Sequence, residues 1–139
     1  MIGNWEAECY PWEFPYSLKS NLVITNEQVK RNYLLYETTD CSERPISDLE
    51  WVEVYTIGKR YENTNIFDYD IEVKQCTEKK ENDLNLCENL NSGGKSFEIV
   101  SILNKKQSFV GSGDSGKDCL SKENRCKIID ILHIFHKIE

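Results

Sequence analysis

Histidine is a frequent general base and metal ligand, and this sequence contains only two, His133 and His136. On a strand, residues three apart point to opposite faces, so the two rings would not share a metal ion or a proton-transfer role. On a helix they would be neighbours, yet two histidines without a nearby third ligand form a weak metal site. We therefore expect no bound metal.

Serine chemistry would need a nucleophile set against a histidine and an acid, and the chain has no Gly-x-Ser-x-Gly elbow. The run Gly113-Asp114-Ser115-Gly116 resembles a fragment of a serine-protease active site, but a chain of 139 residues has no room for the second barrel of such an enzyme. It does not fit a phosphate loop, because Asp118 follows Gly116-Lys117 where serine or threonine is required. We expect no catalytic residue, no cofactor and no enzymatic activity.

Asp68 and Asp70 place two carboxylates on one face of a predicted strand. Glycosidases use paired carboxylates, but these come from opposing walls of a cleft and lie in unequal environments. We expect a solvated strand face here.

The six cysteines form an even set without a C-x-x-C pair or a Cys/His group at zinc-ligand spacing, which favours disulfides over a metal site. Disulfides predict a secreted or periplasmic protein. The start of the chain has no basic segment followed by an apolar core, so we expect that a signal peptide was removed and that Met1 is an expression start. A lipid anchor on a removed upstream segment is compatible with this expectation. The cysteines are Cys9, Cys41, Cys76, Cys87, Cys119 and Cys126.

The chain carries 17 basic and 24 acidic residues, a net charge of −7, which argues against binding to nucleic acid or to anionic lipid. No apolar run approaches the roughly 18 residues of a membrane-spanning helix. The length fits a single domain over residues 1–139.

Alternation of apolar and polar residues predicts eight strands and no convincing internal helix. The last segment is ambiguous, because its apolar residues would also gather on one side of a helix, but its five isoleucines favour a strand. Residues 75 to 95 read as a long charged loop that a Cys76–Cys87 bridge would pin. The predicted strands are Gly3–Cys9, Leu18–Thr25, Val29–Thr38, Leu49–Ile57, Phe67–Lys74, Phe97–Asn104, Gln107–Val110 and Lys127–Ile138.

Eight strands with mostly short connections predict an all-β fold, an eight-stranded antiparallel up-and-down barrel. Its interior would be filled by side chains or would hold one small ligand.

Gly3-Asn4-Trp5 resembles the Gly-x-Trp signature of lipocalins. The wider pattern, Gly-x-Trp-x-x-x-Cys from Gly3 to Cys9 and Tyr-x-x-x-x-Cys from Tyr36 to Cys41, is similar to small bacterial secreted or lipoprotein barrels that are lipocalin-like. The resemblance covers about the first sixty residues and implies a Cys9–Cys41 bridge. The other four cysteines are not part of the lipocalin pattern. Of the 15 pairings that six cysteines allow, we choose Cys9–Cys41 with the two local pairs, Cys76–Cys87 and Cys119–Cys126.

We expect a non-catalytic, lipocalin-like binding protein, with a small apolar ligand or a protein as its partner. The alternative is a protein-interaction or cell-surface module with a filled core and disulfide-pinned loops. Inward candidates for ligand contact are Trp51, Tyr55, Phe67, Tyr69, Ile71, Phe97 and Ile99, and Trp12, Phe14 and Tyr16 would line the mouth.

Overall fold

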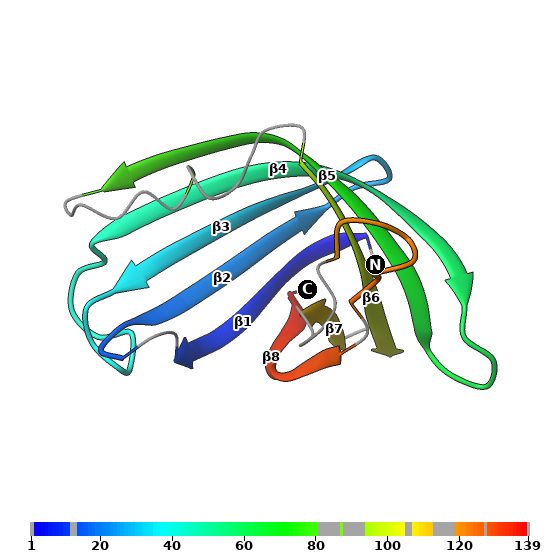
Figure 1. The fold of residues 1–139 in the computed structure, drawn as a ribbon. Coiled ribbons are helices and arrows are strands. Elements are labelled where there is room, and N and C mark those ends of the chain that lie inside the picture. Colours follow the sequence, from blue (N-terminus) through cyan, green and yellow to red (C-terminus); the bar gives the residue numbers. More distant parts are fainter. Residues whose placement is uncertain are drawn as a thin grey trace.

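The computed structural model describes residues 2–11, 14–80, 87, 94–104, 107–112, 119–126 and 128–138, and these contain eight β-strands and no α-helix (Figure 1). The ambiguous last segment is a strand, as predicted. The strands are β1 Gly3–Pro11, β2 Ser17–Ile24, β3 Gln28–Tyr36, β4 Ser47–Arg60, β5 Ile66–Lys80, β6 Lys95–Asn104, β7 Gln107–Ser112 and β8 Ile128–Ile138.

Each strand pairs antiparallel with the next one in the chain, and β8 also pairs with β1, from Asn4 opposite Ile138 to Ala7 opposite Phe135. The sheet curls so that β1 to β5 form a broad curved wall, with β7 and β8 beneath β1 (Figure 1). The prediction of an all-β antiparallel fold is confirmed.

The concave face of this wall carries the apolar core at one end. Alternate residues of β1, β2 and β3 point inward and meet β8 in a cluster whose members are at most 7% exposed. Burial of each large side chain contributes roughly 1.5 to 3 kcal/mol. The cluster consists of Trp5, Ala7, Leu22, Ile24, Val29 and Phe135, with Tyr55 packed against it.

The prediction of a loop over residues 75 to 95 is wrong in its first part, because β5 continues to Lys80. This extension pairs with the start of β4, from Ser47 opposite Lys80 to Val52 opposite Gln75. Opposite charges face each other in this ribbon, for example at Asp48 and Lys79. Backbone pairing and charge complementarity therefore extend the strand where hydrophobic alternation ends.

All three expected disulfides are present: Cys9–Cys41, Cys76–Cys87 and Cys119–Cys126. Cys9 lies at an irregularity in the pairing of β1 with β2, which falls between Ala7 and Tyr10. Three cross-links indicate an oxidising, extracytoplasmic environment. Within the described ranges, no helix has the length and apolar character needed to cross a membrane.

Candidate functional site

Two oppositely charged side chains, Arg31 and Glu53, point into the concave face from neighbouring strands. Both stand in the middle of stripes that are otherwise apolar or aromatic, because alternation sends every second residue of β3 and β4 inward. The strand register pairs Arg31 with Trp51 and Val29 with Glu53, which makes the two charged residues diagonal neighbours.

The Glu53 carboxylate accepts four hydrogen bonds from three side chains. Arg31 donates from Nε at 2.9 Å and from Nη2 at 2.8 Å to Glu53 Oε1, and the Tyr69 hydroxyl donates to the same oxygen at 2.9 Å. Trp51 Nε1 donates to Oε2 at 3.0 Å. Glu53 is 0% exposed and Arg31 5% exposed, so this is a dry, fully organised ion pair. We call Arg31, Glu53, Tyr69 and Trp51 the inner cluster.

Burial and the Glu53 charge shift the proton affinities of the inner cluster. Burial alone would lower the pKa of Arg31, but the Glu53 carboxylate, together with Tyr33 and Tyr69, outweighs it and raises that pKa well above its ordinary value. Burial, followed by the Glu53 charge, raises the pKa of Tyr69 well above its ordinary value. Arg31 therefore stays charged and Tyr69 stays a hydrogen-bond donor over the physiological range.

Aromatic rings surround the ion pair. The Arg31 guanidinium lies 5.6 Å from the centre of the Trp51 ring, and Tyr33 stacks at a tilt on Trp51 with 5.1 Å between ring centres. Tyr55 and Tyr69 form a second tilted pair at 5.9 Å. Tyr33, Trp51 and Tyr55 are only half-buried, so the aromatic wall beside the buried ion pair is reached by solvent.

A second carboxyl, Glu98, faces the inner cluster from β6. It stands directly opposite Tyr69 in the β5–β6 ladder and therefore points to the same side of the sheet. Burial, reinforced by Glu53 and opposed by Arg31, raises the pKa of Glu98 to about 7. Among the described residues its carboxylate accepts one side-chain hydrogen bond, from Ser96 Oγ at 3.2 Å.

The structure brings several predicted contact residues to this face and leaves others elsewhere. Trp51 and Tyr69 belong to the inner cluster, and Phe67 and Ile71 share the inward side of β5 with Tyr69. Tyr55 packs against the apolar core, and its hydroxyl donates to the Thr25 carbonyl at 2.7 Å. Of the predicted mouth, Phe14 is 88% exposed and Tyr16 is half-buried, while Trp12 lies outside the described residues.

The expectation that Phe97 and Ile99 point inward is wrong. They pair with Asp70 and Asp68, on the side of the sheet opposite Tyr69 and Glu98. The loop at 119–126 is bound to Phe97: Phe97 N donates to the Cys119 carbonyl at 2.7 Å, Cys126 N donates to the Phe97 carbonyl at 3.0 Å, and the Arg125 guanidinium lies beside the Phe97 ring. A disulfide-closed segment far along the chain thus contacts Phe97 on the outer side of the sheet, which strand alternation alone does not reveal.

Asp68 and Asp70 do not form the solvated face that we expected. Arg125 lies over them, with Nη1 2.6 Å from Asp70 Oδ1 and Nε 3.4 Å from Asp68 Oδ1. The Tyr61 hydroxyl also donates to Asp68 at 2.8 Å, and the Arg125 guanidinium lies 5.6 Å from the centre of the Phe97 ring. We call Arg125, Asp68 and Asp70 the outer cluster, and its position beside the Cys119–Cys126 bridge identifies it as the attachment of this loop.

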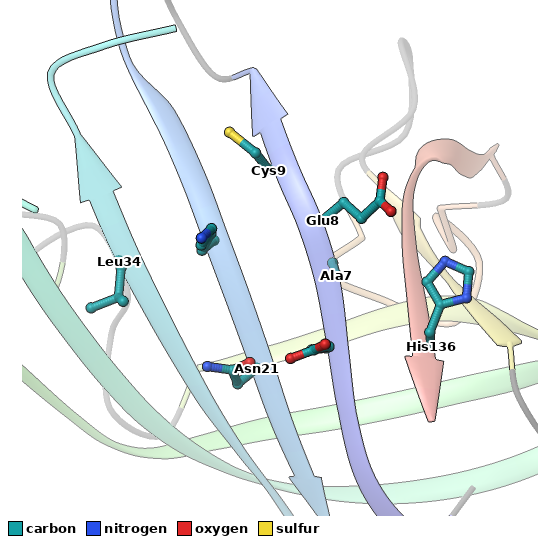
Figure 2. Close-up of a pocket in the computed structure, with 8 residues that line it drawn as sticks. Ala7, Glu8, Cys9, Asn21, Leu34 and His136 are labelled. Carbon is teal, nitrogen blue, oxygen red and sulfur yellow. The ribbon is translucent and has the colours of Figure 1, made fainter. Parts of the chain in front are cut away.

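A hollow of about 580 Å³ lies on the outer surface across β1, β2, β3 and β8. Figure 2 shows Glu8 and Cys9 on β1, with Asn21 and Leu34 on one side and His136 on the other. All its charged side chains are exposed, so no buried polar group is held ready there for a ligand. The inner face offers the better candidate site, because its polar groups are already desolvated and oriented.

The sequence contains a signal for the inner cluster that we did not use. Arg31 and Glu53 each interrupt an inward stripe, with Val29 and Tyr33 beside one and Trp51 and Tyr55 beside the other. A charged side chain inside an apolar stripe is buried only when it is paired. Two side chains of opposite charge in the inward stripes of successive strands therefore indicate an ion pair. Glu98 is harder to find, because both sides of β6 carry apolar residues.

A scan against models of known protein families finds no match to this chain, and a search among curated proteins finds no relative. Among the described residues, no group of three or more histidine, cysteine, aspartate or glutamate side chains is placed to hold a metal ion. The chemistry of the inner face is therefore interpreted from its own geometry.

Proposed function

We propose that the chain is a non-catalytic, secreted or periplasmic binding protein with an eight-stranded, lipocalin-like barrel. Its ligand is a small molecule with an apolar body, held on the concave face beside the inner cluster. The observation that carries this proposal is the fully buried Arg31–Glu53 pair with half-accessible aromatic rings next to it. The three disulfides support the compartment.

Stability gives a poor account of the inner cluster. Desolvation of a buried ion pair costs several kcal/mol per ion, and replacement of such pairs by apolar residues is often neutral or stabilising. Small-molecule sites, in contrast, combine apolar and aromatic walls with a few fixed polar groups that orient the ligand. The inner cluster has this composition, since Arg31 and Glu53 lie among Trp51, Tyr33 and Tyr69.

The test uses N-phenyl-1-naphthylamine, an apolar dye that fluoresces in dry sites, and a variant that fills the concave face. Ser96 points inward opposite Ile71 and is half-buried, whereas its neighbour Lys95 is exposed on the other side of the sheet. We expect saturable dye binding with one site per chain, at least tenfold weaker in Ser96→Trp and unchanged in Lys95→Trp. Equal binding by both variants, or no binding to the wild-type chain, would contradict the proposal.

Native mass spectrometry of gently purified protein supplies a second readout. A co-purified small molecule that is retained by Lys95→Trp and lost from Ser96→Trp would identify the natural ligand by mass. The same molecule on both variants would place it on another surface.

One observation favours a protein partner as the second candidate. The loop at 119–126 is fastened to β6 by backbone hydrogen bonds and closed by a disulfide, and it presents Leu120, which is 69% exposed. A filled concave face, shown by the absence of dye binding to the wild-type chain, would make this loop the better candidate surface.

A further inference from the structure

On the inner face around Glu98, carboxyl groups outnumber cationic side chains. The charged side chains that act on its carboxyl are Arg31 from β3 and Glu53 from β4, so two carboxyl groups share one guanidinium. Tyr33 from β3 and Tyr69 from β5 are the titratable hydroxyls in the same environment, and burial raises the pKa of both, which keeps them neutral.

The carboxylates of Glu53 and Glu98 differ in the hydrogen bonds that they accept. Glu53 accepts two hydrogen bonds from Arg31, one from Tyr69 and one from Trp51. Glu98 accepts its only side-chain hydrogen bond, among the described residues, from Ser96. The guanidinium is therefore committed to Glu53, and Glu98 stands across the concave face as an acceptor without its own cation.

We propose that Glu98 binds the cationic head of the ligand, and that the ligand is a small primary amine with an aromatic or alkyl body. The ammonium would lie between the Glu98 carboxylate and the rings of Tyr33 and Trp51, with the body along the inward residues of β5. This inference rests on the proposed function and specifies the chemical class of its ligand.

Three observations favour a cation over an anion or a neutral polar group. An anion would meet two carboxyl groups, and the Arg31 guanidinium that could receive it already donates from two nitrogens to Glu53 Oε1. Half-accessible tyrosine and tryptophan rings beside a carboxylate are the usual surroundings of a bound ammonium. The net charge of −7 also raises the local concentration of cations around the protein.

The raised pKa of Glu98 agrees with this role. At a pKa of about 7 the carboxyl holds a proton part of the time at neutral pH, because its burial outweighs the opposing effect of the Arg31 charge. A bound ammonium would place a positive charge beside the Glu98 carboxylate and so displace the proton. Amine binding near pH 7 should therefore release a fraction of one proton per chain.

Isothermal titration calorimetry with two matched probes tests the inference. Tryptamine carries an ammonium on an indole, and 3-ethylindole is its uncharged counterpart. At pH 8 we expect the wild-type chain to bind tryptamine at least tenfold more tightly than 3-ethylindole. Glu98→Gln should remove this preference and leave the affinity for 3-ethylindole within about twofold.

Glu72→Gln is the matched control, because it removes one negative charge from a solvent-accessible pair with Lys74 on β5, whose Glu72 side chain is 31% exposed, and keeps Glu98. It should retain the preference for tryptamine. Titrations at pH 7 in two buffers of different ionisation enthalpy should show proton release on tryptamine binding in the wild-type chain and none in Glu98→Gln.

The outcomes separate the two proposals. If 3-ethylindole binds and tryptamine binds no better, the amine inference is overturned and the binding function stands. If Glu98→Gln keeps the preference, the cation lies elsewhere and the inference is likewise overturned. If neither probe binds the wild-type chain, the amine inference is overturned, and if the naphthylamine dye also fails to bind, the proposed function itself falls.

Discussion

The inner and outer clusters use the same chemistry on opposite sides of one sheet. In each, an arginine whose side chain is 6% exposed pairs with a carboxylate: Arg31 with Glu53 on the neighbouring strand, and Arg125 with Asp68 and Asp70 on β5. The carboxylate of Glu53 is 0% exposed, whereas those of Asp68 and Asp70 are 20% and 30% exposed. The outer carboxylates keep part of their hydration, and the inner carboxylate has exchanged all of it for protein donors.

We relate this difference to the roles of the two clusters: the outer cluster attaches a loop, and the inner cluster lies at the proposed binding site. Arg125 lies on a loop and donates to the Glu98 carbonyl at 2.7 Å as well as pairing with two aspartates, so it fixes the loop at 119–126 to the sheet. Arg31 lies within a paired strand that needs no fastening. The proposed binding of a ligand on the concave face explains the burial of Arg31 with Glu53 better than the stability of the fold does.

The largest effect is expected from Glu53→Gln, which leaves the buried Arg31 charge without a counter-ion. We expect a loss of about 3 to 5 kcal/mol in the free energy of unfolding, measured by urea denaturation. Glu50→Gln is the control on the same strand, because its pair with Lys30 is exposed, and it should cost less than about 1 kcal/mol. Equal losses in the two variants would mean that the inner pair is not desolvated in solution.

Replacement of both charges sharpens this result. Arg31→Met combined with Glu53→Leu removes the buried charges together, so the double variant should be more stable than Glu53→Gln. It should also lose tight binding of the naphthylamine dye or of the natural ligand. A double variant that keeps full binding would assign the inner cluster to stability alone.

Glu98→Gln should change how stability depends on pH. Burial raises the pKa of Glu98 from its ordinary value of 4.5 to about 7, so the folded chain holds this proton more tightly than the unfolded chain. The resulting stabilisation is present below about pH 4.5 and is lost as pH rises towards 7, a change of roughly 2 to 3 kcal/mol. We therefore expect Glu98→Gln to be more stable than the wild-type chain at pH 8, with little difference at pH 5. The same difference in urea midpoints at both pH values would contradict the burial of this carboxyl.

The Cys119–Cys126 bridge is the covalent part of the outer attachment. Replacement of both cysteines by serine should cost about 2 kcal/mol, because the closed loop is short. The Cys9–Cys41 bridge spans 32 residues, so its double serine variant should lose more. Dye binding on the concave face should survive loss of the Cys119–Cys126 bridge, and its disappearance would show that the loop shapes the inner site.

The contrast between the clusters also shows what the sequence could predict. The antiparallel all-β fold and the last strand followed from alternation, and the charges at Arg31 and Glu53 were visible within inward stripes. The outer cluster was not visible, because Arg125 is 55 residues from Asp70 in the chain and its loop has no periodic pattern. The prediction that Phe97 points inward was wrong for the same reason, since its contact with the loop at 119–126 has no signal in the local sequence pattern.

The smallest effect is expected from Arg125→Gln. The side chains of Asp68 and Asp70 are 20% and 30% exposed and Tyr61 continues to donate to Asp68, so both carboxylates keep contact with water after loss of the guanidinium, although Oδ1 of Asp70 is buried. We expect a loss of about 1 to 2 kcal/mol in urea denaturation and unchanged dye binding. In a double-mutant cycle with Asp70→Asn, the coupling energy should be about 1 kcal/mol, well below the loss from Glu53→Gln. A loss in the free energy of unfolding as large as that of Glu53→Gln would contradict the distinction between the two clusters. It would mean that the charges of the outer cluster are as strongly desolvated as those of the inner cluster.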